Sequence, residues 1–161
     1  MKIIGPPQAL PPDDSKLSLF LAGSIDMGSA PNWQAAVAAL LHHRDITLLN
    51  PRRATWWPAI RQRKDDPGFR AQVDWEQDHL AAADRVLFYF APQSHAPITL
   101  AELGVCCGSE RRPASHMVVY CPPAFYRKGN VDILCERRGI CVFDEEAALF
   151  SFLNDSNFLS P

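Results

Sequence analysis

One acidic residue, Glu102, lies within an otherwise apolar octet at residues 97–104 (PITLAELG). The octet follows an apolar run at 86–90 that is bounded by polar residues, which predicts a buried strand. Pro97 favours the first position of a helix, so Glu102 is expected in the first two turns of a helix that begins beyond that strand. The helix dipole favours an ionised carboxylate there. Two interpretations are open: a structural glutamate held by backbone amides or an arginine, or a carboxylate nucleophile.

Helical phase selects a second acid, Glu76, on the helix predicted at 67–84. The apolar stripe that must face the sheet consists of Phe69, Val73, Leu80 and Ala83. At 100° per residue Glu76 falls within this stripe, whereas Asp78 points to solvent. Gln72 precedes Glu76 by one turn and can hydrogen-bond to it. Glu76 is therefore either a catalytic acid or the buried partner of Arg52 or Arg53.

Apolar runs alternate with helical patterns along most of the chain. The predicted strands are 17–23, 46–49, 86–90, 116–121 and 139–143, and later helices are expected at 97–108, 130–137 and after Asp144. This alternation predicts an α/β, Rossmann-like or flavodoxin-like three-layer sandwich whose five-stranded parallel sheet has the order 2-1-3-4-5. The first and third strands are then neighbours, and ligands bind in the crevice between their carboxyl ends. The loop at 23–26 (GSID) meets the loop leading to Glu102 there, which favours the functional interpretation of Glu102.

Composition limits the class of protein. The chain has 161 residues with 16 basic and 18 acidic side chains, which predicts one domain at 17–161 after an extended Pro-rich arm at 1–16 and argues against a nucleic-acid or membrane binder. The apolar runs are shorter than the ~20 residues of a membrane span, and the first segment is too short for a signal peptide, so a cytoplasmic location is expected. The five cysteines lack a C-x-x-C pair; neither a disulfide framework, a metal site nor a cofactor is expected.

Several short segments together resemble the nucleoside 2-deoxyribosyltransferase-like family between about residues 17 and 143. They are 20–25 (FLAGSI), 50–53 (NPRR), 72–76 (QVDWE), 83–84 (AD) and 97–104 (PITLAELG). The resemblance implies that Glu102 attacks C1′ of a deoxynucleoside and that Glu76 contacts the sugar or base. It also implies a homodimer or larger homo-oligomer in which Asn130 reaches a neighbour's active site.

Two positions depart from the family's pattern. The transferases carry an aspartate six residues before the nucleophile to hold the sugar 5′-hydroxyl, and related nucleotide hydrolases carry a serine there for phosphate. This chain has Ala96. The hydrolases also carry an arginine after Gly-Ser-Ile, where this chain has Asp26, which argues against binding a 5′-phosphate in their manner.

The residues and the resemblance together predict an N-glycosidic bond enzyme acting on a (deoxy)nucleoside or nucleotide. A covalent glycosyl–Glu102 intermediate would pass the sugar to another base or to water, as in a deoxyribosyltransferase or an N-glycoside hydrolase. The alternatives are a non-catalytic nucleotide-sensing module of the same fold and a hydrolase of NAD or ADP-ribose-type ligands. With Glu102 and Glu76 as catalytic residues, the predicted substrate-binding residues are Gly23, Ser24, Ile25, Asn50, Arg52, Arg53, Trp57, Gln72, Trp75 and Asn130.

Overall fold

The computed structural model describes residues 1–9, 11, 15–26, 30–53 and 61–160. A six-stranded sheet forms its centre, in the order β1-β3-β2-β4-β5-β6, and every pair of neighbouring strands is parallel. The strands are β1 (Lys2–Ile4), β2 (Ser18–Gly23), β3 (Thr47–Leu49), β4 (Arg85–Tyr89), β5 (Met117–Tyr120) and β6 (Cys141–Phe143). The predicted α/β class and strand order are therefore confirmed, because β3-β2-β4-β5-β6 is the predicted order 2-1-3-4-5.

The sheet has one strand more than the five predicted, and the extra strand comes from the N-terminal arm. β1 pairs with β3 in the register Lys2↔Thr47 and Ile4↔Leu49. The backbone N–H of Lys2 donates to the carbonyl of Ile46 at 2.9 Å. This edge strand buries Ile4 but leaves its two other residues exposed, so its three residues carry no pattern that predicts a strand. The arm then reaches α2, where the carbonyl of Gln8 accepts a 2.6 Å hydrogen bond from the indole N–H of Trp75.

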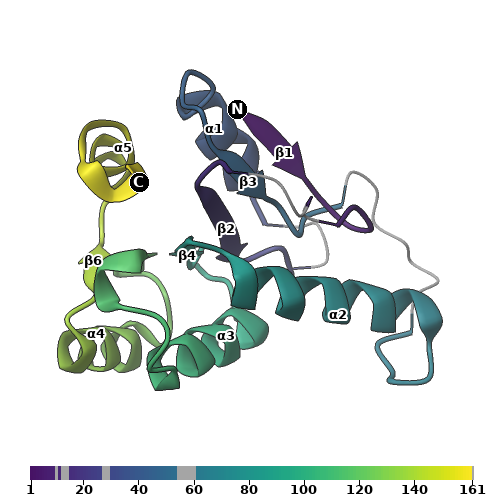
Figure 1. Cartoon of the computed structure of the whole chain (residues 1–161). Coiled ribbons are helices and arrows are strands. Elements are labelled where there is room, and N and C mark those ends of the chain that lie inside the picture. The colour runs from purple at the N-terminus through teal and green to yellow at the C-terminus, as the bar shows by residue number, and fades with distance from the viewer. Residues whose placement is uncertain (10, 12–14, 27–29, 54–60, 161) are drawn as a thin grey trace.

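Helices cover both faces of the sheet (Figure 1). α2 (Pro67–Ala82), α3 (Pro97–Gly108) and α4 (Lys128–Arg138) pack on one face, while α1 (Trp33–Leu40) and α5 (Glu146–Asp155) pack on the other. Short 3₁₀ helices lie at Ala114–His116 and Asn157–Leu159. Alternate side chains of β4 enter the hydrophobic cores on the two faces of the sheet. Phe88 faces α2, α3 and α4, and Leu87 and Tyr89 face α1 and α5.

The observed starts of three helices can be compared with the predicted ones. α2 begins with Pro67 after Asp66, whose side chain accepts from the N–H groups of Gly68 and Phe69. α4 begins at Lys128, slightly before the predicted residue 130. The last helix begins at Glu146 with Glu145, rather than Asp144, at its N-cap.

Two further features bear on the sequence expectations. Four of the five cysteines are buried, Cys141 is exposed, and all five are free thiols. Within the described ranges, no helix combines the length and the apolar character needed to cross a membrane.

Candidate functional site

The loops after β2 and β4 are tied together by Ser24. Its backbone N–H donates to the carbonyl of Tyr89, and its Oγ accepts from the N–H of Ala91, both at 3.0 Å. Ser24 is buried. These bonds fix the crevice at the point where the helices that follow neighbouring strands lie on opposite faces. Ser24 thus shapes the site predicted from the sequence.

Gly23 allows a close approach that any other residue would prevent. A Cβ at this position would lie 2.5 Å from both Trp33 Cζ2 and the carbonyl oxygen of Tyr89. The indole of Trp33 stacks on the ring of Tyr89 with centroids 4.5 Å apart and an interplanar angle of 4°. Its N–H also donates to the carbonyl of Ser24 at 3.0 Å. The first turn of α1 is therefore held against the same loop.

A large open cleft of about 1880 Å³ lies above this point. It brings together most of the residues predicted for the site: Gly23, Ser24, Ile25, Asn50, Arg52, Arg53, Gln72, Glu76 and Glu102. The elements that contribute them are the carboxyl ends of β2 and β3 together with α2 and α3. Trp57 lies outside the described residues.

The two predicted catalytic carboxylates share the cleft and affect each other electrostatically. Burial, followed by the charge of Glu76, raises the pKa of Glu102 to about 8. Burial also raises the pKa of Glu76, and the hydrogen bond from Gln72 and the charge of Arg53 partly oppose that rise. The sequence favoured an ionised carboxylate at Glu102 because of the helix dipole, but here burial outweighs the dipole. With a pKa of about 8, Glu102 is mostly protonated at neutral pH.

Gln72 fixes Glu76 from one turn earlier on α2, as helical spacing predicts. Its Nε2 donates to Glu76 Oε1 at 2.6 Å and to the carbonyl of Pro51 at 3.0 Å. Its Oε1 accepts from Nε of Arg53. The phase prediction also separates Glu76 from Asp78 correctly, since Glu76 is partly buried and Asp78 is exposed.

Arg52, in the turn after β3, contacts backbone carbonyls just before α1. Its guanidinium donates to the carbonyls of Ala30 at 3.0 Å and Pro31 at 3.1 Å, and to Gln34 Oε1 at 3.4 Å. Asn50 Oδ1 accepts from the backbone N–H of Arg52 at 3.0 Å. Both residues therefore join the turn after β3 to the start of α1, and they build the wall of the cleft.

Two predicted binding residues do not lie in the cleft. Trp75 is buried beneath the N-terminal arm and stacks on His79 with ring centroids 4.0 Å apart. The arm covers it from a distant part of the sequence, which helical phase on α2 alone does not reveal. Asn130 is exposed in the first turn of α4, so any contact with substrate would have to be made in another subunit.

Sequence reasoning missed Gln34, which is wholly buried on α1 and lines the cleft. The signal was present, because Gln34 precedes Val37 by three residues and Leu41 by seven and so belongs to the apolar stripe. Two residues noted as departures, Asp26 and Ala96, also line the cleft, and both have left-handed backbones with φ of 45° and 39°. Such strain in residues other than glycine is common at functional sites.

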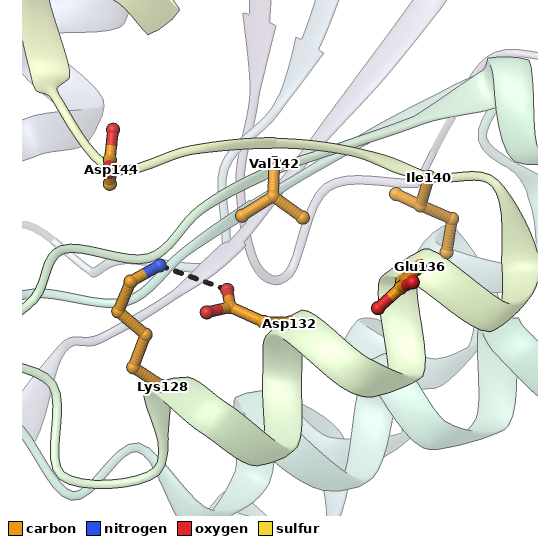
Figure 2. A pocket seen from close by; sticks show the side chains of 6 residues that line it. All are labelled: Lys128, Asp132, Glu136, Ile140, Val142 and Asp144. Carbon is orange, nitrogen blue, oxygen red and sulfur yellow. Dashed lines mark hydrogen bonds and ion pairs between the residues drawn. The ribbon is translucent and has the colours of Figure 1, made fainter.

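A second, smaller hollow of about 360 Å³ lies between α4 and β6 (Figure 2). Its walls are Lys128, Asp132, Glu136, Ile140, Val142 and Asp144. The Lys128 ammonium and the Asp132 carboxylate pair at 3.0 Å within one turn of α4. None of the predicted site residues line it. The cleft that contains Glu102 is therefore the candidate functional site.

The chain is similar in fold to a solved structure described as a conserved protein from Enterococcus faecalis V583, with a TM-score of 0.59 and 13% identity over 86% of this chain and 98% of that one. No curated protein sequence matches the chain. A sequence model described as nucleoside 2-deoxyribosyltransferase like matches residues 16–125, which includes both carboxylates and every strand from β2 to β5. The chain belongs to the nucleoside 2-deoxyribosyltransferase-like family.

Proposed function

We propose that this protein breaks the N-glycosidic bond of a nucleoside, with Glu102 as the nucleophile and Glu76 as its partner in proton transfer. The observation that carries the proposal is the pairing of these two partly buried carboxylates in the cleft at the carboxyl ends of the strands. Membership of the family supports a nucleoside-related enzyme. Asp26 lines the cleft at the position where the related nucleotide hydrolases carry an arginine, which favours unphosphorylated nucleosides over 5′-phosphates.

The proton on the carboxylate pair balances the first step. The bond between C1′ and the base nitrogen breaks, its electrons go to the base, and a Glu102 oxygen bonds to C1′. The proton that Glu102 carries before the reaction moves to the leaving base, directly or through Glu76. The products are a glycosyl ester on Glu102, an ionised Glu76 and a neutral base.

Glu76 is then placed to assist the second step. Its carboxylate accepts a proton from water or from an acceptor base, which attacks C1′ and releases Glu102. The bonds from Gln72 to Glu76 and to Pro51 keep the carboxylate fixed between the two steps. Whether water or a base is the acceptor decides between hydrolase and transferase.

One observation favours a second candidate, a module that binds nucleosides or nucleotides without turnover. A carboxylate with a pKa of about 8 is mostly protonated at neutral pH and in that form is a hydrogen-bond donor rather than a nucleophile. The other alternative, a hydrolase of NAD or ADP-ribose-type ligands, was based on the basic turn at 50–53. Arg52 donates to three protein oxygens, so this alternative has less support.

The test is a chromatographic screen of deoxynucleosides, ribonucleosides and their 5′-phosphates for release of free base, with and without a second base. The wild type should release base from at least one nucleoside, and Glu102→Gln should lower the rate by several orders of magnitude. Asp78→Asn, a change on the exposed face of α2, serves as the control. Retention of near wild-type rates by Glu102→Gln would rule out the covalent mechanism, and binding without base release would favour the module.

A further inference from the structure

Gln34 has a buried donor without a partner. The residue is 0% exposed, and its Nε2 has no hydrogen-bond partner among the described residues. Its Oε1 accepts from Nη1 of Arg52 at 3.4 Å, which fixes the orientation of the amide because only the oxygen can face a guanidinium. A buried amide nitrogen without an acceptor is unfavourable and rare in folded proteins, so it requires an explanation.

The position of Gln34 indicates where an acceptor would come from. Gln34 lines the cleft that also contains Glu102 and Glu76. It lies on α1, whereas the carboxylates lie on α3 and α2 across the ends of the strands. Its neighbour Trp33 is fixed by stacking on Tyr89 and by its bond to Ser24, so the amide is held in place before any ligand binds.

We propose that Gln34 is a specificity-determining residue whose Nε2 donates to an oxo oxygen of the nucleobase. This inference rests on the proposed function, since it assigns a contact to the nucleobase of the same nucleoside whose sugar Glu102 attacks. The unpartnered group of this amide is its Nε2 donor, because its oxygen faces Arg52. An amino group of a base at this point would bring its N–H donors against the N–H donors of Gln34, and no hydrogen bond could form.

The surroundings favour a single compact oxygen over a phosphate. The amide nitrogen is shielded from bulk water. An acceptor that reaches it must therefore fit between α1 and the turn after β3. A hydrated phosphate is large and costly to desolvate, whereas an oxo oxygen of a base is small and uncharged. A site built around one buried hydrogen bond rejects analogues that cannot make it.

Two matched substitutions separate the donors from the rest of the side chain. Gln34→Glu keeps an acceptor for Arg52 and removes both donors, and Gln34→Met conserves volume and removes both polar groups. Gln8→Glu makes the same chemical change at an exposed residue outside the cleft. Circular dichroism and thermal melting verify that each variant is folded.

Affinity is measured by titration calorimetry in a Glu102→Gln background, so that turnover does not obscure binding. The probes are two pairs that differ by oxo against amino groups: 2′-deoxyinosine with 2′-deoxyadenosine, and 2′-deoxyuridine with 2′-deoxycytidine. The parent should bind the oxo member of at least one pair roughly tenfold more tightly or better. Both Gln34 variants should lose this preference, and Gln8→Glu should keep it.

Three results would overturn the inference: an unchanged preference in the Gln34 variants, an equal loss for all probes, or a parent that prefers no oxo probe. A loss seen only with 2′-deoxyinosine 5′-phosphate would assign the donor to phosphate and would also overturn it. The proposed function fails separately, if protein with intact Glu102 binds these nucleosides but releases no base.

Discussion

Gln72 Nε2 donates a 2.6 Å hydrogen bond to Glu76 Oε1, one turn further along α2. Gln72 thereby stabilises the ionised form of Glu76 against the effect of burial. Glu76, which accepts this hydrogen bond, therefore ionises more readily than Glu102. The pKa of Glu102 shows the larger rise, to about 8. The hydrogen bond from this neutral amide, together with the charge of Arg53, therefore favours the ionised form of Glu76 and leaves the shared proton on Glu102.

Gln72→Met should therefore change the pH dependence of the reaction. Without the donor the pKa of Glu76 rises further, so the acidic limb of kcat/KM should move to higher pH. The measurement is a pH–rate profile of wild type and variant on the same nucleoside. A role confined to packing would lower the rate without moving the limb, and Gln8→Met, the same change at an exposed residue outside the cleft, provides the comparison.

Glu76→Gln and Asp78→Asn should differ sharply although they are two residues apart. Glu76 lines the cleft beside Glu102, and its loss as a proton carrier should cost roughly 10²- to 10⁴-fold in kcat/KM. Asp78 is exposed on the opposite side of the helix, so its variant should behave as the wild type. Steady-state kinetics on both variants check this, and equal losses would contradict the assigned roles.

The raised pKa of Glu102 should appear in the pH dependence of stability. The native protein binds a proton at Glu102 up to a pH of about 8, whereas the unfolded chain releases it near 4.5, the ordinary pKa of a glutamate side chain. The native state thus binds more protons in this window, so Glu102 makes stability fall as pH rises from about 5 to 8. Denaturant unfolding at a series of pH values should show a shallower decline in Glu102→Gln. Identical slopes in wild type and variant would mean that Glu102 titrates normally.

The pairing of β1 with β3 predicts opposite behaviour for two adjacent isoleucines. Ile4 is 2% exposed and belongs to the core, so Ile4→Ala should lower the free energy of unfolding by about 2–4 kcal/mol. Ile3 is 49% exposed, and Ile3→Ala should change it by less than about 1 kcal/mol. Denaturant melts measure both. Similar small effects would show that the arm does not form part of the sheet in solution.

Exposed apolar side chains on α3 and α4 motivate a prediction about assembly. Val105 is 70% exposed, Ile133 is 60% exposed, and Ile98 and Tyr126 are also exposed. Exposed large apolar side chains are typical of interfaces when they form a contiguous patch. We expect a homo-oligomer that Ile133→Lys dissociates, whereas Ile3→Lys at the far edge of the sheet does not. Sedimentation velocity distinguishes these outcomes.

The same assembly would explain the exposed position of Asn130. If Asn130 serves a neighbouring subunit, then Glu102→Gln and Asn130→Ala proteins, each inactive alone, should recover part of the activity when mixed. Exchange of subunits is verified independently by a mass difference. No recovery after proven exchange would place each site within one chain.

Local patterns predict much of this molecule, and contacts between distant segments explain what they miss. Apolar runs locate β2 to β6, and helical phase places Glu76 in the cleft and Asp78 in solvent. β1 was not predicted because three residues with a single buried side chain leave no periodic signal. The burial of Trp75 depends on the arm passing over it. The pKa of Glu102 depends on burial and on Glu76 in a different helix, which a sequence cannot quantify.

The left-handed backbone at Ala96 affects how the protein can evolve. Aspartate, asparagine and glycine adopt this conformation with less strain than alanine, and Ala96 lines the cleft. Replacing it with aspartate or asparagine would relieve backbone strain while adding a hydrogen-bonding group to the wall of the cleft. Ala96 is also 5% exposed and packs in the core, so this gain is set against the cost of burying a polar group. A ligand that supplies a hydrogen-bond partner would offset that cost, and position 96 thereby couples the stability of the protein to the substrate it accepts.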